Sequence, residues 1–251
     1  AMHSFIADKL GYGIEYKKIS IAEDAFDKEA EKLFSELDGF NVTIPFKLRI
    51  IGHLKKIEGD AEVFGAVNTV KCGSRTGFNT DGLGFELMLK NAGVPVAGKS
   101  FLLLGCGGAG RSVAKKLADG GAKVFVYDRD FESAQNLERE FAGVKALEKL
   151  ENKPYFAIIN ATGVGMHKTV GLSPAGEELI SLCDTAIDLI YVPEKSEFLK
   201  IAEKLGKKIL NGKAMLFYQA YFAQCIYSGL QPDEAVAKEL FEQFEKAREN
   251  L

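Results

Sequence analysis

Residues 99–130 read KSFLLLGCGGAGRSVAKKLADGGAKVFVYDRD, and this stretch decides the fold. The continuous apolar run at 100–104 predicts a buried strand, and the spacing of apolar residues over 109–119 predicts an amphipathic helix. Residues 123–128 predict a second strand. Because neighbouring parallel strands need a crossover connection of this length, the stretch indicates a strand–helix–strand unit.

Strand-like and helix-like patterns continue to alternate toward the C-terminus. Further strands are predicted at residues 156–161, 185–191 and 208–210, and further helices at residues 131–141 and 196–205. Such a succession is typical of an α/β protein with helices on both faces of a parallel sheet. We therefore predict a Rossmann-type, doubly wound parallel sheet domain over residues 83–212.

The flanking residues predict a second, smaller α/β domain. Helices are expected at 2–10 and 24–37, strands at 14–19 and 40–44, and two C-terminal helices at 214–227 and 233–248. Since two helices without a sheet rarely form a domain, the C-terminal pair is expected to pack back onto the N-terminal part. The second domain is thus residues 1–82 plus 213–251, and we expect a cleft between the two domains.

Composition and charge exclude several classes of protein. The 251 residues carry a net charge of −3, so there is no broad positive field for a nucleic-acid backbone. Every apolar run is shorter than the roughly 20 residues needed to cross a bilayer. The four cysteines lack metal-type or redox-type spacing, and the first residues do not form a secretory signal. We expect a cytoplasmic protein with no nucleic-acid partner, no membrane partner and no metal.

A glycine-rich motif, Gly105-Cys-Gly-Gly-Ala-Gly110, satisfies G-x-G-x-x-G between a predicted strand and a predicted helix. The first glycine permits the tight turn, the second lets the backbone approach a pyrophosphate, and the third lets the helix pack close to the strand. Free N–H groups at the helix start attract the anion. We expect a dinucleotide held by Gly105, Gly107, Gly108, Ala109 and Gly110; a structural turn and an S-adenosylmethionine site are the alternatives.

The identity of the dinucleotide depends on Asp128-Arg129-Asp130, at the end of the second predicted strand. An acidic residue at this position accepts hydrogen bonds from the ribose hydroxyls of NAD, whereas an arginine can bind the 2′-phosphate of NADP. Asp128 favours NAD(H) because its charge repels a phosphate, and Arg129 favours NADP(H). The residues alone leave both cofactors open.

Polar side chains between residues 41 and 81 occur where strands and turns do not require them. The stretches are Asn41-Val-Thr-Ile-Pro-Phe-Lys47, Ala66-Val-Asn-Thr69 and Asn79-Thr-Asp81. A lysine just beyond a strand end can donate or accept a proton when a carboxylate accompanies it, and Asp81 is a candidate partner for Lys47. On spacing alone, two unrelated surface charges are the more common outcome.

Three more motifs follow in the chain: Asn160-Ala-Thr162, Asp188-Leu-Ile-Tyr191 and Met215-Leu-Phe-Tyr-Gln219-Ala. The complete set, in this order and over almost the whole chain, resembles the shikimate dehydrogenase family. The resemblance implies an oxidoreductase that acts on a CH–OH group and transfers a hydride reversibly between NADP(H) and the C3 position of shikimate/3-dehydroshikimate. It further implies a role in chorismate and aromatic amino-acid biosynthesis, a small-molecule substrate, and a monomer or homodimer.

The same resemblance assigns roles to residues. It implies that Lys47 and Asp81 hold the reacting oxygen and manage its proton. It also implies that four further residues bind the ring hydroxyls of the substrate. Those substrate-binding residues are Thr43, Asn68, Tyr191 and Gln219. Besides the glycine loop, Asp128 and Arg129, the cofactor is expected to contact Thr162, Gly163, Ile190, Gly212 and Met215.

Two departures from the family pattern qualify these roles. Ala1-Met2-His3 aligns with a helix that in the family follows a strand and a loop with two carboxylate-binding serines, so we expect that strand and both serines to be missing from this sequence. Three explanations are open: a shortened chain, a weakened affinity for the substrate, or a carboxylate that is held differently. Asp128 and Asp130 stand where the family usually has neutral residues. Two alternatives follow: an NAD-accepting quinate/shikimate dehydrogenase, and a catalytically weakened, nucleotide-binding regulatory homologue.

Overall fold

The computed structural model describes residues 2–249 and contains two compact units. One unit comprises residues 1–91 with 216–251, and the other comprises residues 92–215. The units divide at 91/92 and 215/216, whereas the sequence suggested 82/83 and 212/213. The reason is that α4 (Asp81–Asn91) continues unbroken past residue 82 and ends where the Asn91 amide donates to the Tyr218 hydroxyl at 3.0 Å. Residues 1, 250 and 251 of the predicted smaller domain lie outside the described residues.

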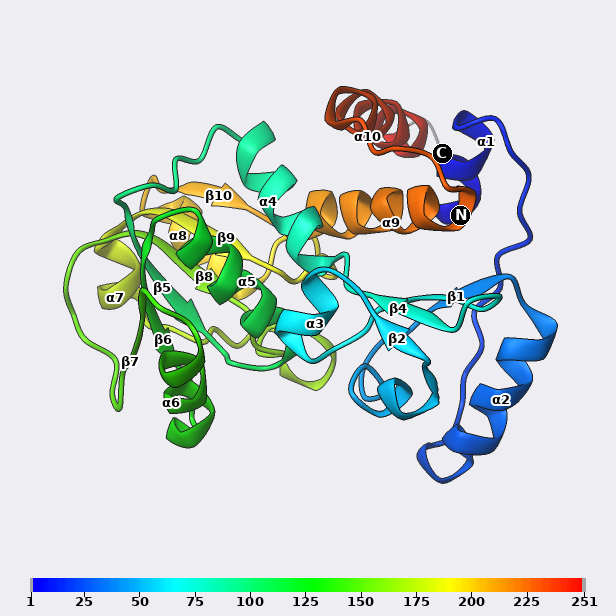
Figure 1. Cartoon of the computed structure of the whole chain (residues 1–251). Helices are drawn as coiled ribbons and strands as arrows, with labels where there is room; N and C mark the ends of the chain where they lie inside the picture. The colour runs from blue at the N-terminus through cyan, green and yellow to red at the C-terminus, as the bar shows by residue number, and fades with distance from the viewer. Residues whose placement is uncertain (1, 250–251) are drawn as a thin grey trace. The chain divides into compact units, whose positions relative to one another are not determined.

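Residues 92–215 form the predicted Rossmann-type, doubly wound domain. Its sheet has six parallel strands in the order β10-β9-β8-β5-β6-β7. The strands are β5 (Ser100–Leu104), β6 (Lys123–Tyr127), β7 (Val144–Ala146), β8 (Tyr155–Asn160), β9 (Cys183–Asp188) and β10 (Lys208–Leu210). The helices are α5 (Gly108–Asp119), α6 (Phe131–Glu140), α7 (Glu177–Ser181) and α8 (Glu197–Lys204). The labelled elements can be followed in Figure 1.

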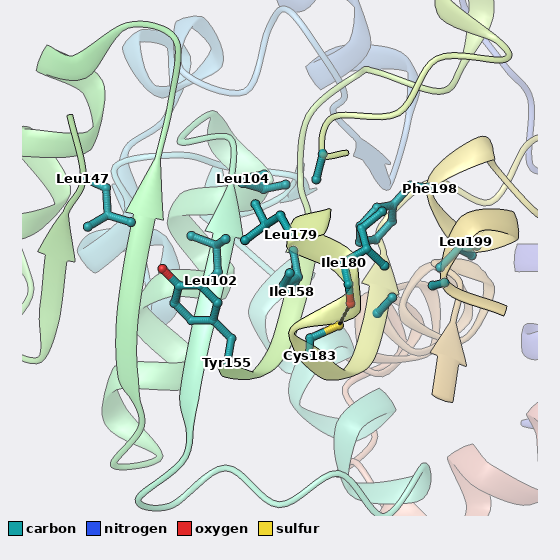
Figure 2. Packing of buried hydrophobic residues seen from close by; sticks show 13 residues of the cluster. Leu102, Leu104, Leu147, Tyr155, Ile158, Leu179, Ile180, Cys183, Phe198 and Leu199 are labelled. Carbon is teal, nitrogen blue, oxygen red and sulfur yellow. Dashed lines mark hydrogen bonds between the residues drawn. The ribbon is translucent and has the colours of Figure 1, made fainter. Parts of the chain in front are cut away.

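The core of this unit explains why the apolar runs become central strands. Leu102 and Ile158 lie on one face of the sheet and pack against Leu179 of α7 and Phe198 of α8, as Figure 2 shows. All four side chains are at most 4% exposed. Because successive strand residues point to opposite faces, the neighbours of Leu102 are buried on the other side, so both faces need apolar residues.

The order of the strands also places the candidate cofactor loop. β5 pairs with β6 on one side and with β8 on the other, so the chain changes direction across the sheet between β5 and β8. In sheets of this kind a crevice opens beyond the carboxyl ends of the strands at that point. The glycine loop follows β5 and Thr162 follows β8, which brings both segments to the same edge.

The other unit contains a short four-stranded sheet in the order β1-β3-β4-β2. Its strands are β1 (Gly39–Asn41), β2 (Lys56–Ile57), β3 (Thr69–Lys71) and β4 (Thr76–Phe78), and only the β2–β4 pairing is parallel. Its helices are α1 (Met2–Lys9), α2 (Phe26–Glu36), α3 (Asp60–Phe64), α4, α9 (Lys213–Ser228, most of which belongs here) and α10 (Glu234–Glu249). Short 3₁₀ turns lie at Glu23–Ala25, Arg49–His53 and, in the Rossmann-type unit, His167–Thr169.

The predicted strand at residues 14–19 is wrong. These residues have no strand assignment, and β1 pairs with β3 alone among the described strands. A strand needs backbone hydrogen bonds to a neighbour, and this segment instead approaches β1 through a side chain: the Tyr16 hydroxyl donates to Asn41 Oδ1 at 3.0 Å. Within the described residues, none of the helices has the length and apolar character that a membrane span requires.

Candidate active site

The site begins with an ion pair between two residues that are far apart in the sequence. Lys47 follows β1 and a turn in which the Phe46 N–H donates to the Thr43 carbonyl, and Asp81 is the first residue of α4. Lys47 Nζ lies 2.5 Å from Asp81 Oδ2, and the two side chains are 18% and 11% exposed. Partial burial strengthens the attraction between the charges relative to a surface pair, while some contact with solvent remains. A small molecule can therefore reach the ammonium group.

Hydrogen bonds hold the Asp81 carboxylate in one orientation. The Asn68 amide donates to Asp81 Oδ1 at 2.8 Å, so both carboxylate oxygens have a donor. The Asp81 backbone N–H donates to Asn79 Oδ1 at 3.0 Å, and Asn79 in turn donates to the Ala66 carbonyl. This arrangement places a fixed proton donor, the Lys47 ammonium, beside amide and carboxylate groups that can bind hydroxyls.

The remaining predicted substrate residues differ in their surroundings. Gln219, on α9, donates to the Leu216 carbonyl at 2.8 Å, and its Oε1 lies 3.5 Å from the hydroxyl of Thr80. Thr43 is exposed at the turn that precedes Lys47. Tyr191 lies in the Rossmann-type unit, three residues beyond β9, and its side chain is 44% exposed. The structure thus gathers Lys47, Asp81 and Asn68 by direct contact.

The glycine loop contains two kinds of glycine. Gly105 has φ +99°, and a Cβ atom on Gly110 would lie 2.0 Å from the Gly105 carbonyl oxygen. A side chain therefore cannot be added at Gly110 without moving α5 away from β5. A methyl group added to Gly107 or Gly108 would meet no atom within 4 Å, and the N-cap residue of α5, Gly107, has no side chain that could bond the first N–H groups of the helix. This gives an anion open space and uncapped N–H groups, which is what a pyrophosphate needs.

Asp128 is bonded to the glycine loop itself. Its Oδ2 accepts the Cys106 N–H at 2.8 Å, and its Oδ1 accepts the Asp130 N–H at 3.0 Å. Arg129 is exposed beside it. The carboxylate is therefore fixed at the edge of the loop, where it suits the hydroxyls of a ribose, and the guanidinium is accessible to a phosphate. The donor groups fit a dinucleotide and do not by themselves select NAD or NADP.

A buried polar network shapes the loops that follow β8 and β9. Asn160 accepts hydrogen bonds from the N–H and hydroxyl of Thr162, and it donates to Asp188 Oδ1 at 3.0 Å. Asp188 also accepts from the Ile190 N–H and from the Ser196 hydroxyl. Burial raises the pKa of the Asp188 carboxyl, while these three hydrogen bonds oppose the shift. The network fixes the backbone at Thr162 and Ile190, two predicted cofactor contacts.

The other predicted cofactor contacts occupy mixed environments. A Cβ atom on Gly212 would lie 2.0 Å from the Leu189 carbonyl oxygen, so this glycine is required for backbone packing. Met215 is 7% exposed at the start of α9, and Gly163 is exposed after Thr162. Ala109 lies in the first turn of α5.

Known proteins are similar to this chain in sequence and in fold. The profile of the shikimate dehydrogenase substrate binding domain matches residues 1–70. A shikimate dehydrogenase (NADP(+)) from Clostridium perfringens is 36% identical over 236 residues, which cover 91% of this chain and 86% of the relative. The chain belongs to the shikimate dehydrogenase family.

Solved shikimate dehydrogenases superpose on almost the whole chain. The enzyme from Thermus thermophilus, in complex with NADP(H) and shikimate, has a TM-score of 0.85 and 34% identity, and the match covers 96% of this chain and 92% of that one. The enzyme from Listeria monocytogenes, in complex with shikimate and NAD, has a TM-score of 0.79 and 27% identity, with coverage of 95% and 90%. The family therefore includes structures with either nucleotide.

Sequence patterns assigned no role to several side chains that support the ion pair of this shikimate dehydrogenase homologue. Thr69 and Thr80 are fully buried and both bond to Asn68. Asn41 connects Thr69 to two tyrosines. The available signal was the presence of polar residues at consecutive positions beside the ends of short strands that also carry buried apolar residues. That pattern shows buried polar groups but not their partners.

Proposed function

We propose that this protein is an NADP(H)-dependent shikimate dehydrogenase that reduces 3-dehydroshikimate reversibly to shikimate in the chorismate pathway of aromatic amino-acid biosynthesis. The observation that carries the proposal is the partly buried Lys47–Asp81 pair, held by Asn68, in a chain of this family. The substrate is a ring with several hydroxyls and one reacting carbonyl, and the pair offers the groups needed to bind and protonate such an oxygen.

The proposed chemistry assigns the proton to the chain and the hydride to the cofactor. When bound, a nicotinamide would supply the hydride for the carbonyl carbon, and the alcohol forms only with a proton from the chain. Lys47, directly or through a water that it orients, gives a proton to the developing alkoxide oxygen, and in the reverse direction it accepts that proton. Asp81 holds the ammonium group in place, and Asn68 holds Asp81. General acid–base catalysis of this kind contributes about 10²–10⁴-fold to the rate.

The proposed substrate contacts use polar groups of defined position. Asn68, Thr43, Gln219 and Tyr191 are proposed to hydrogen-bond ring hydroxyls. An analogue without one of these hydroxyls leaves a polar group unpaired, which explains why such a site rejects it. The proposed nucleotide contacts are the glycine loop, Asp128, Arg129, Thr162, Gly163, Ile190, Gly212 and Met215. A monomer or homodimer in the cytoplasm is the proposed form of the enzyme.

Asp128 favours a second candidate within the same reaction class, an NAD-accepting quinate/shikimate dehydrogenase. Its carboxylate is fixed at the end of β6, where it would accept hydrogen bonds from unphosphorylated ribose and repel a 2′-phosphate. The Listeria relative binds NAD in its solved structure. The third possibility, a weakened regulatory homologue, is disfavoured by the presence of both Lys47 and Asp81.

Steady-state assays separate the three candidates. Initial rates of shikimate oxidation are measured with NADP⁺ and with NAD⁺, and quinate oxidation is measured beside them. The proposed function predicts turnover of shikimate with NADP⁺ as the better cofactor. Comparable turnover with NAD⁺, together with quinate oxidation, identifies the second candidate. Nucleotide binding without turnover of any substrate–cofactor pair contradicts the dehydrogenase and identifies a regulatory homologue.

A further inference from the structure

A line of hydrogen-bonded side chains runs through the unit of residues 1–91 and 216–251 and ends at Asp81. The Tyr227 hydroxyl donates to Asn41 Oδ1 at 3.1 Å, and Asn41 Nδ2 donates to Thr69 Oγ1 at 3.1 Å. The Thr69 hydroxyl donates to Asn68 Oδ1 at 2.8 Å, and Asn68 Nδ2 donates to Asp81 Oδ1 at 2.8 Å. Each group in this line donates toward Asp81 and accepts from the side of Tyr227.

The tyrosine end supports the direction of the line at Asn41, whose Nδ2 also donates to the Asn68 carbonyl at 3.2 Å. Asn41 Oδ1 accepts from two phenols, since Tyr16 also donates to it at 3.0 Å. Burial raises the pKa of both Tyr16 and Tyr227, so both hydroxyls keep their protons and stay donors. With its oxygen turned to the phenols, the Asn41 amide must present its NH₂ group to Thr69. The Thr69 hydroxyl accepts that bond and turns its own proton toward Asn68.

The hydrogen bond from Asn68 to Asp81 depends on the orientation of the Asn68 amide, because an asparagine amide can rotate by half a turn and exchange its oxygen and nitrogen. If the Asn68 amide turned by half a rotation, its oxygen would face the Asp81 carboxylate, and two acceptors would lie within hydrogen-bond distance of each other. Thr69 is fully buried and Asn68 is 3% exposed, so water cannot easily replace a lost donor at this point. The orientation of the Asn68 amide thus controls the orientation of Asp81, and Asp81 controls Lys47.

We propose that Thr69, with Asn41 and Tyr227 behind it, is a positioning residue that keeps the Asn68 amide turned toward Asp81 and so keeps the Lys47–Asp81 pair in its reactive geometry. This inference rests on the proposed dehydrogenase function for its kinetic consequence. Its structural part, the fixed orientation of the Asn68 amide, is independent of turnover.

A second restraint on Asn68 sets the size of the expected effect. The backbone N–H of Thr80 donates to Asn68 Oδ1 at 2.9 Å, and the Thr80 hydroxyl accepts from Asn68 Nδ2 at 3.1 Å. These bonds remain when the Thr69 hydroxyl is removed. Loss of a single buried hydrogen bond from such a network corresponds to about a threefold to tenfold change in the ratio of the correct to the turned orientation, which sets an upper limit on the kinetic effect.

The test compares Thr69→Val, Thr69→Ser and a matched control, Thr76→Val. Thr76 is also a buried threonine of the same sheet, and its hydroxyl bonds to Ser74, away from Asp81. We expect kcat/KM for shikimate to fall by more than twofold and at most about tenfold in Thr69→Val, and to stay within twofold of wild type in Thr69→Ser and Thr76→Val. Solvent exchange of the Asn68 side-chain NH₂ protons, followed by ¹H–¹⁵N NMR, should quicken in Thr69→Val alone.

The two readouts keep this inference distinct from the proposed function. Wild-type kcat/KM and wild-type NH₂ exchange in folded Thr69→Val overturn the positioning role and leave the dehydrogenase intact. An inactive wild-type protein overturns the proposed function, and the exchange measurement then decides about Thr69. If Thr69→Val does not fold, the double variant Tyr16→Phe/Tyr227→Phe removes the donors at the other end. Unchanged NH₂ exchange in that variant overturns the role, and quickened exchange supports it.

Discussion

The two kinds of glycine in the 105–110 loop allow nucleotide binding to be separated from folding. Gly107→Ala adds a methyl group where no atom lies within 4 Å, at a backbone position with φ −67° and ψ −173° that alanine adopts readily. Gly110→Ala adds the same group 2.0 Å from the Gly105 carbonyl oxygen. The first change leaves the fold alone and fills the space proposed for a pyrophosphate, while the second forces α5 away from β5.

The expected magnitudes follow from these contacts. Gly107→Ala should change the free energy of unfolding by about 0.5 kcal/mol or less, because a small loss at the helix start opposes the reduced freedom of the unfolded chain. It should raise the Kd for NADPH by about tenfold or more, since a close backbone contact with an anion is lost. Gly110→Ala should cost about 1–3 kcal/mol or more of stability, because a backbone oxygen cannot yield as a flexible side chain does.

Urea unfolding and fluorescence titration with NADPH measure both quantities. Gly176→Ala is the matched control, because Gly176 precedes α7 in the same unit, has no atom near its Cβ position and is extended like Gly107. The control should bind NADPH as wild type does. If Gly107→Ala binds NADPH within threefold of wild type, or if Gly110→Ala is as stable as wild type, this account of the loop is refuted.

Three further changes test the cofactor preference, the buried network and a pH-sensitive contact. Asp128→Asn should shift the ratio of kcat/KM for NADP⁺ over NAD⁺ toward NADP⁺ by about tenfold, because one charge that repels a 2′-phosphate is removed; an unchanged ratio argues against this role. Ser196→Ala should cost about 2–4 kcal/mol in urea unfolding, because the buried Asp188 carboxylate loses a donor and α8 loses its N-terminal cap; a loss under 1 kcal/mol contradicts it. Burial lowers the pKa of His53, but hydrogen bonds to two carboxylates of α2 outweigh burial and raise this pKa above 6.5. The protonated imidazole therefore stabilises the fold fully below pH 6.5, and this stabilisation is lost as the pH rises through the raised pKa. The stability difference between wild type and His53→Gln should therefore shrink from pH 5.5 to pH 8.5, and a difference that grows contradicts the assignment.

The Rossmann-type unit could be predicted from the sequence because its signals are local. The run at 100–104 is continuously apolar, and β5 is buried on both faces. The glycine loop lies directly between that strand and α5, so motif and context support each other. Strands of five or six residues also carry enough pattern to be recognised. β6, β8 and β9 all correspond to predicted strands.

The smaller unit was harder to predict because its strands are only two or three residues long. Segments of that length are too short to show the alternation of apolar and polar residues that marks a strand. The segment at 14–19 does show this alternation, but it is not a strand in the structure. The ion pair between Lys47 and Asp81 had no local signal either, since spacing along the chain says nothing about contact in space. The residue types made Asp81 a candidate partner, but only the resemblance to a family favoured the pair over two unrelated surface charges, and the hydrogen bonds around Asn68 have no sequence signal.

If the Lys47 ammonium supplies the proton for carbonyl reduction, Lys47→Met should remove most of the turnover, because methionine nearly keeps the length of the side chain and removes the charge. Steady-state kinetics of 3-dehydroshikimate reduction with saturating NADPH should show kcat reduced by about 10²–10⁴-fold, with KM for 3-dehydroshikimate changed by only a few fold. A folded Lys47→Met protein that keeps kcat within tenfold of wild type contradicts the account.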